Sequence, residues 1–163
     1  MSERAAAGNR ALNWRADRSG FSLLELLITM ALIATLSAMV VPALFDARER
    51  GKILEASTMI VAISLDLQRY SDLNGRYPSS LGEAGLDGQV DPWGFEYRYL
   101  RIEGIKGYQG VRKDRFLVPL NTDYDLYSVG PDGTSRAPLN SPASADDIIR
   151  ANNGIFIGLA SEF

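Results

Sequence analysis

The chain has 163 residues and a formal net charge of −3, so it is long enough for one domain plus a membrane anchor but not for two globular domains. It has no basic cluster, and we therefore expect no nucleic-acid partner. It contains no cysteine and no histidine, which excludes a disulfide framework and removes the commonest general base. No nucleophile–base pattern, Walker loop or dinucleotide fingerprint appears, so we expect a protein that is not an enzyme.

A basic segment is followed directly by an apolar run. Residues 1–20 contain four arginines, and residues 21–44 contain one ionisable side chain, Glu25. About 20 apolar residues are enough for a helix to cross a bilayer, so the run predicts a transmembrane helix. The Gly20–Phe21 bond lies where the polar segment ends, which indicates a processed amino terminus with residues 1–20 as a cleaved leader. The arginines before the run favour a cytoplasmic amino end.

Two simpler kinds of membrane-targeting segment are alternatives for the apolar run. A secretory signal peptide has an apolar core of about 7–15 residues followed by a cleavage site of small residues. Here the run is longer, and the small residue Gly20 precedes it. A plain signal anchor, with the same orientation in the membrane, stays open as the second alternative.

The helical pattern continues beyond the predicted membrane span. Over residues 45–75, apolar side chains recur at alternating steps of three and four, which draws one apolar stripe along a helix. The stripe consists of Ile53, Ala56, Ile60, Ile63, Leu67 and Tyr70. Asn74 and Gly75 are typical of a helix end, and Pro78 disfavours continuation. We therefore predict one helix from about Ser22 to Leu73, with a transmembrane half over 21–44 and an amphipathic half over 45–75.

Residues 76–163 have the composition of a small sheet domain with long loops. Alternating apolar and polar residues predict strands over 95–100 and 124–129, and a weaker strand over 115–119, where Pro119 favours an edge position. Ser144 is positioned to cap a short helix. We expect Trp93 and the tyrosines at 97, 99, 124 and 127 to pack the sheet against the helical stripe. The predicted fold class is α+β, with a long amino-terminal helix packed on a small antiparallel sheet.

The residues at the polar–apolar junction carry a family resemblance. The sequence from Gly20 to Glu25, GFSLLE, resembles the cleavage and methylation motif of type IV pilins and of the pseudopilins of type II secretion. Pro42 lies at the position where the helix of that family usually bends. Four further blocks resemble the major pseudopilin and occur in the same order: NGRYP at 74–78, DPWG at 91–94, YDLYSVGPDG at 124–133 and DDI at 146–148.

The chain departs from this family pattern in three places. Its leader is longer than in most members of the family. Residues 101–122, between the DPWG block and the last predicted strand, are an insertion. The family's glycine-rich loop before the final aspartates is replaced by TSRAPLNSPASA at 134–145.

The resemblance implies how the amino terminus is used. A prepilin peptidase cleaves between Gly20 and Phe21, and the new Phe21 amine is N-methylated. In an assembled filament this amine pairs with the Glu25 carboxylate of a neighbouring subunit. The alternative is that Glu25 simply lies at headgroup depth, one turn into the helix, where a carboxylate costs less than the about 2.5–3.5 kcal/mol expected at a helix centre.

The resemblance also implies a calcium site near the carboxyl end. The matched positions supply three carboxylates and two other oxygens: Asp132, Asp146, Asp147, the backbone oxygen of Val129 and an oxygen of Thr134. Calcium prefers 6–8 such oxygen ligands. The spacing alone leaves a second interpretation open, in which Asp132 stabilises a turn and the other two aspartates lie at the amino end of a short helix.

The function implied by the resemblance is structural. The chain would be a major-pseudopilin-like subunit of a periplasmic filament that drives proteins out through a type II secretion system. Its expected partners are copies of itself, other pseudopilins, the inner-membrane assembly platform and the prepilin peptidase. It would be a single-pass protein of a Gram-negative inner membrane, with its carboxy-terminal domain in the periplasm. The alternative is a type IV pilin in a surface fibre for adhesion, motility or DNA uptake.

Overall fold

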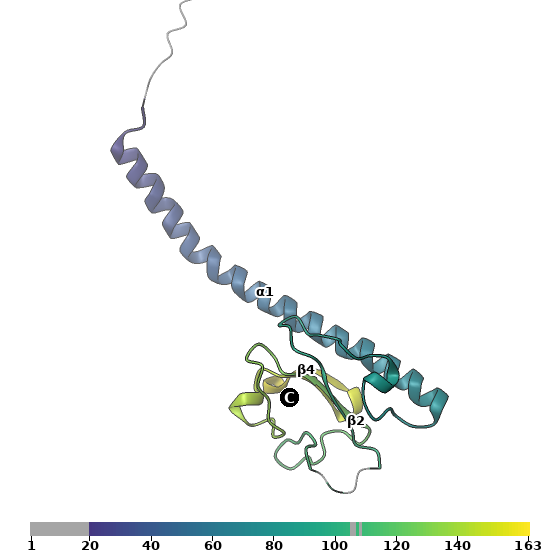
Figure 1. Ribbon diagram of the computed structural model, residues 1–163. Coiled ribbons are helices and arrows are strands. Elements are labelled where there is room, and N and C mark those ends of the chain that lie inside the picture. Colours follow the sequence, from purple (N-terminus) through teal and green to yellow (C-terminus); the bar gives the residue numbers. More distant parts are fainter. Residues whose placement is uncertain (1–19, 105–106, 108) are drawn as a thin grey trace, which may run out of the picture. The chain divides into compact units, whose positions relative to one another are not determined.

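The computed structural model describes residues 20–104, 107 and 109–163 (Figure 1). The predicted leader therefore lies outside the described residues, apart from Gly20. The chain divides into two compact units, residues 1–42 and residues 43–163, which are described separately below.

One long helix, α1 (Leu23–Asn74), confirms the predicted helix to within one residue at each end. It continues without interruption through Pro42 and Gly51. Gly75 ends it with a backbone φ of 72°, and the Gly75 amide donates to the Ser71 carbonyl oxygen at 2.8 Å. Helices commonly end at a residue with a left-handed backbone conformation. Glycine adopts this conformation readily because it has no Cβ atom to clash.

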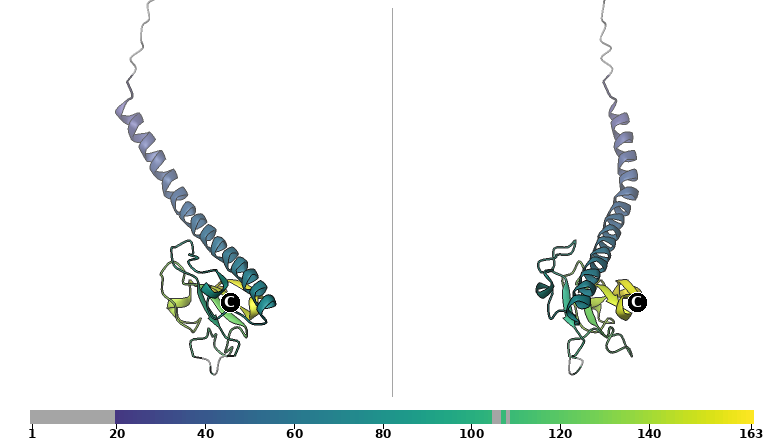
Figure 2. Two further views of the ribbon diagram at one scale, coloured as in Figure 1. Left: turned by 45° about the vertical axis from the view of Figure 1, so that its right-hand side comes forward. Right: turned by 90° about the vertical axis from the view of Figure 1, so that its right-hand side faces the viewer.

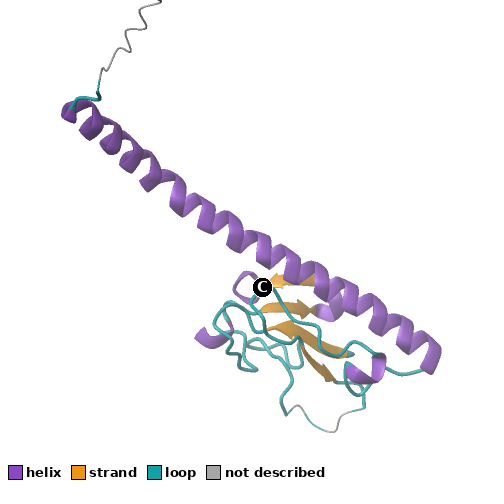
Figure 3. Ribbon diagram, turned by 45° about the horizontal axis from the view of Figure 1, so that its top comes forward, coloured by secondary structure: helices purple, strands orange, loops and turns teal. Residues whose placement is uncertain are grey.

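The sheet belongs to the second unit and has four antiparallel strands in the order β1-β2-β3-β4 (Figure 3). The strands are β1 (Arg98–Arg101), β2 (Tyr124–Ser128), β3 (Ile148–Ala151) and β4 (Phe156–Leu159). Short 3-10 helices lie in the connections: η1 (Gly82–Ala84), η2 (Pro142–Ser144), η3 (Asn152–Gly154) and η4 (Ala160–Glu162). The predicted strands over 95–100 and 124–129 correspond to β1 and β2, whereas β3 and β4 were not predicted.

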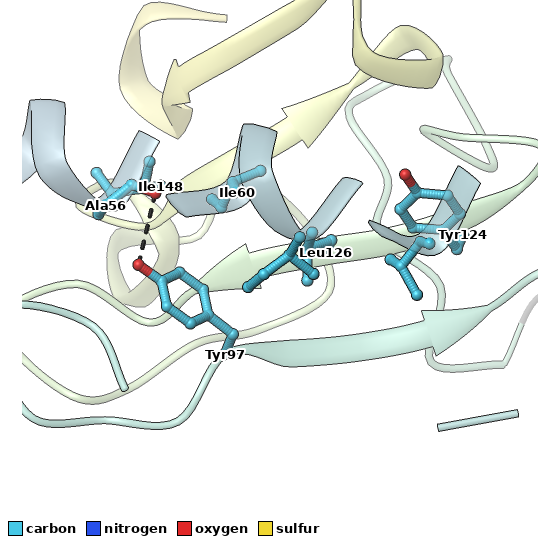
Figure 4. Packing of buried hydrophobic residues seen from close by; sticks show 8 residues of the cluster. Ala56, Ile60, Tyr97, Tyr124, Leu126 and Ile148 are labelled. Atoms are coloured by element: carbon cyan, nitrogen blue, oxygen red, sulfur yellow. Dashed lines mark hydrogen bonds between the residues drawn. The ribbon is translucent and has the colours of Figure 1, made fainter. Parts of the chain in front are cut away.

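One face of the sheet is covered by the second half of α1, which lies along it in all views (Figures 1, 2 and 3). The predicted stripe is confirmed, since its four central residues are buried. They pack against Tyr97, Tyr124, Leu126 and Ile148 (Figure 4). The Tyr97 hydroxyl also reaches the Ala56 carbonyl oxygen at 3.5 Å. This first core holds the helix and the sheet together.

The opposite face of the sheet is covered by loops. The second core consists of Leu120, Leu139, Ile149, Ala151 and Ala160, with Tyr127 and Phe156 partly buried against it. Residues 101–122, which the sequence identifies as an insertion, and residues 134–145 each supply one of these side chains. The two segments are joined by a short parallel bridge between Lys113 and Pro138. The insertion therefore forms part of the second core.

The structure corrects two predictions in these loops. Residues 115–119 do not form a strand; Asp114 and Leu117 pair in a tight turn that leaves Phe116 fully exposed. Ser144 does not cap a helix. Pro142 begins η2 instead, because its fixed φ suits the first helical position, and Ser144 is the last residue of that turn.

The aromatic residues largely follow the prediction. The ring centroids of Tyr77 and Tyr124 lie 4.9 Å apart, and Tyr99 and Trp93 are partly buried against the first core. The Trp93 indole also donates to a Glu49 carboxylate oxygen at 2.9 Å, which ties the DPWG block to the helix. Tyr127 is the exception, because it faces the second core.

The first core predicts the cost of truncating one of its side chains. Leu126 is 1% exposed, so Leu126→Ala removes buried methyl groups and leaves a cavity. We expect the free energy of unfolding to fall by about 2–5 kcal/mol. The matched control is Leu54→Ala, on a side chain that is 68% exposed in the monomer, which should change stability by no more than about 0.5 kcal/mol. Denaturant unfolding of the detergent-solubilised monomer measures both. Equal stability of the two variants would contradict the assignment of the core.

Candidate functional site

The predicted processing and assembly residues lie at the start of α1, in the first unit. Gly20 and Phe21 precede the helix, and the Phe21 side chain is 77% exposed. The Leu26 amide donates to the Ser22 carbonyl oxygen at 3.1 Å, which closes the first turn. Glu25 lies in this first turn and is exposed. A carboxylate there is favoured by the positive end of the helix dipole.

The surroundings of Glu25 make it an unusual residue on this helix. The neighbouring side chains Leu23, Leu24 and Leu26 are apolar and exposed. Glu25 forms no ion pair within the part of the chain that the structure describes. Because a carboxylate in an apolar environment needs a counter-charge, this arrangement suits a partner that comes from outside the described residues.

This half of α1 also has the length and composition of a membrane span. Among the described residues, α1 is the one helix that meets these criteria, and its most apolar segment is entirely unburied. A helix with such an apolar, exposed surface needs lipid or other helices around it.

The predicted calcium ligands lie in the second unit, in the loops around β2 and β3. Asp132 stabilises its own turn, because its carboxylate accepts hydrogen bonds from the Thr134 amide at 2.7 Å and the Thr134 hydroxyl at 2.8 Å. A carboxylate oxygen of Asp146 accepts from the Asp132 amide at 3.3 Å. Gly130, with φ of 67°, allows this approach, since a Cβ there would lie 2.3 Å from the Asp146 carbonyl oxygen.

Asp147 has a different environment. Its side chain is fully buried, and its Oδ2 atom accepts from the Arg112 guanidinium at 2.5 Å and from the Ser135 hydroxyl at 2.6 Å. Burial raises the pKa of the Asp147 carboxyl, while the hydrogen bond from Ser135 and the charge of Arg112 act in the opposite direction. Asp147 is therefore a member of a buried ion pair.

These positions do not form the predicted cage of three carboxylates. The described residues contain no group of three or more histidine, cysteine or acidic side chains that could hold a metal ion. Asp132 and Thr134 are hydrogen-bonded to each other, and Asp147 is paired with Arg112. Val129 is buried, which does not bear on its backbone oxygen. The turn role considered for Asp132 is confirmed. The helix-capping role of Asp146 and Asp147 is wrong, because both residues follow η2. Calcium binding stays a prediction from the resemblance.

Asp91 belongs to the DPWG block and has a structural role that was not predicted. One carboxylate oxygen accepts from the Trp93 amide at 3.0 Å and the Phe95 amide at 2.9 Å. The other accepts from the Ser128 hydroxyl at 2.5 Å. Asp91 thus fixes the block as a turn and attaches it to the end of β2. Aspartate side chains often accept a hydrogen bond from the backbone amide two residues later, and this local pattern is typical of such a turn.

Known proteins match this chain in two ways. A family model described as the prokaryotic N-terminal methylation motif matches residues 15–41, which include Gly20, Phe21 and Glu25. The type II secretion system core protein G of Pseudomonas aeruginosa is 30% identical over 142 residues, covering 73% of this chain and 87% of that protein. The chain belongs to the type II secretion system core protein G family.

Other members of the core protein G family are similar over comparable lengths. The protein of Pectobacterium carotovorum is 29% identical over 79% of this chain and 81% of its own length. That of Klebsiella pneumoniae is 28% identical over 79% of this chain and 91% of its own length. No solved structure shows a significant match to the chain. The chain is thus a pseudopilin, and the apolar helix together with the methylation motif fits a single-pass membrane-anchored protein of a secretion system.

Proposed function

We propose that this pseudopilin is a building unit of a pilus-like periplasmic filament, which drives proteins out of the cell through a type II secretion system. One observation carries the proposal. An exposed carboxylate, Glu25, stands in the first turn of an otherwise apolar helix, inside the segment that matches the methylation motif. Membership of the core protein G family supports the same function.

In the proposed assembly, the two units of the chain have different tasks. The apolar halves of α1 from many subunits pack together as the filament core, since their exposed leucine and isoleucine side chains need apolar neighbours. The sheet domains form the outer surface in the periplasm. Before a subunit leaves the membrane, its amino end faces the cytoplasm. The arginines of the leader favour this orientation, because positively charged segments next to a membrane span stay on the cytoplasmic side.

The proposed partners act at successive stages of filament assembly. A prepilin peptidase processes the subunit, an inner-membrane assembly platform adds it to the growing filament, and other copies and other pseudopilins contact it there. None of these steps requires the subunit to catalyse a reaction, and its relatives are core proteins of a secretion system.

Deletion of the gene tests the proposed function. We expect the loss of protein secretion into the medium, with twitching motility unchanged, and recovery of secretion when the intact gene is returned. Enzyme assays of the culture medium and motility on agar measure the two effects. Loss of motility with normal secretion would contradict the proposal and support a type IV pilin instead.

The processing step predicts a defined mass. Cleavage between Gly20 and Phe21 and methylation of the new amine should remove residues 1–20 and add one methyl group. Intact-mass spectrometry of the protein from membranes of peptidase-competent cells measures this. Cells without the peptidase provide the control, in which the full chain should remain. A full-length chain in both strains would contradict the prediction.

The pairing of Glu25 with a neighbouring amine predicts an assembly defect. Glu25→Ala removes the insertion cost of the carboxylate, so membrane insertion should be unchanged or improved. Filament growth should fall strongly, because the neighbour's Phe21 amine would lose its counter-charge, and breaking a buried ion pair costs about 3–5 kcal/mol. Chemical cross-linking in membranes measures the ladder of subunits. The matched control is Glu96→Ala, which removes an exposed carboxylate from the sheet domain. Equal ladders from both variants would show that Glu25 is not an assembly residue.

A further inference from the structure

Two departures from the family pattern meet at one place in the structure. Arg112 comes from the segment 101–122, and it contacts the substituted loop 134–145 and the aspartate that follows it. Its guanidinium donates to the Ser135 hydroxyl at 2.5 Å and to the Arg136 carbonyl oxygen at 3.2 Å. It also donates to Asp147 Oδ2 at 2.5 Å. The insertion thus brings a positive charge to the loop that precedes the final aspartates.

Arg112 is fixed in this position by its backbone as well as its side chain. The Arg112 amide donates to an Asp125 carboxylate oxygen at 2.6 Å, and its carbonyl oxygen accepts from the Leu120 amide at 2.8 Å. The guanidinium carbon lies 4.2 Å from the centre of the Tyr127 ring, within the range of a cation–π contact. Arg112 is 2% exposed. A buried arginine held at both ends is pre-organised for the carboxylate that it meets.

We propose that the Arg112 guanidinium is a built-in cation for the carboxy-terminal loops of this subunit, so that their folding does not depend on a bound divalent ion. Asp147 needs a counter-charge because it is fully buried, and Arg112 supplies it from the same chain. The charge is permanent, since a guanidinium does not lose its proton in proteins.

The arrangement of the remaining oxygens agrees with this proposal. The Asp132 carboxylate is used by the Thr134 amide and hydroxyl, so it is directed to its own turn. Two atoms of the ion pair, Arg112 Nε and Asp147 Oδ1, have no hydrogen-bond partner among the described residues. A divalent ion on Asp147 Oδ1 would share one carboxylate with the guanidinium and be repelled by it, which weakens binding of a metal ion there. Asp147 Oδ1 is nevertheless the atom of the pair that an added cation could contact, so calcium is the ligand to test.

Thermal unfolding of the full chain in detergent, followed by near-ultraviolet circular dichroism, tests the proposal. We expect the same unfolding temperature, to within about 1 °C, with excess chelator and with millimolar calcium, because a ligand that does not bind the folded state cannot stabilise it. A rise of several degrees on adding calcium would overturn the proposal.

Variants of the ion pair provide the second part of the test. Arg112→Gln should lower the unfolding temperature by several degrees, because Asp147 would stay buried without its counter-charge. The matched control is Arg98→Gln, on an exposed arginine of β1, which should have little effect. The double variant Arg112→Gln with Asp147→Asn removes both charges and should recover part of the loss. Equal unfolding temperatures for Arg112→Gln and Arg98→Gln would overturn the proposal. If Arg112→Gln does not fold, the double variant must fold, and its failure would likewise contradict the role of the pair.

Discussion

The packing of one apolar stripe of α1 against the sheet is the interaction on which the rest of the folded unit depends. Each strand has only four or five residues, and such short strands are not stable unless a hydrophobic face is covered. The buried residues from Ala56 to Leu67 provide that cover. The same helix begins with an exposed apolar segment that has the length and composition of a membrane span, and its second half supplies the domain core.

The second face of the sheet is held by polar groups as well as by apolar ones. Burial raises the pKa of the Asp125 carboxyl, against hydrogen bonds from the Arg112 amide and Asn121, and it also raises the pKa of Asp147. A carboxyl whose pKa is higher in the folded state stabilises the fold at pH values below its unfolded pKa, and this contribution is lost as the pH rises through the folded pKa. At neutral pH the two ionised carboxylates therefore lower the net stability of the fold, even with their partners present. They fix the positions of the loops, and their cost rises further when a carboxylate loses its partner.

The sequence predicted the parts of the fold that depend on local patterns. The bounds of α1, its stripe and strand β2 follow from periodicity over neighbouring residues. Strand β3 was missed because it is buried on both faces and so does not alternate, and because it contains a charge, Arg150. That arginine is paired with Asp123 at 2.7 Å and stacked on Tyr124 at 4.1 Å, contacts between residues more than 20 positions apart. No local pattern reveals such partners.

The same limit applies to the carboxy-terminal aspartates, because local sequence does not reveal the side chains that surround them. The predicted ligands lie in the matching blocks GPDG and DDI, but the environment of Asp147 is set by Arg112, 35 positions earlier in the chain. A calcium ion takes 6–8 oxygen ligands, whereas a guanidinium offers five donors in one plane. In the proposed arrangement a loop built around an arginine needs fewer converging carboxylates, and the Asp132 carboxylate accepts hydrogen bonds within its own turn. In the arrangement proposed above the two unmatched segments act together, because the insertion supplies the arginine and the substituted loop supplies Ser135 and the Arg136 carbonyl group that hold it.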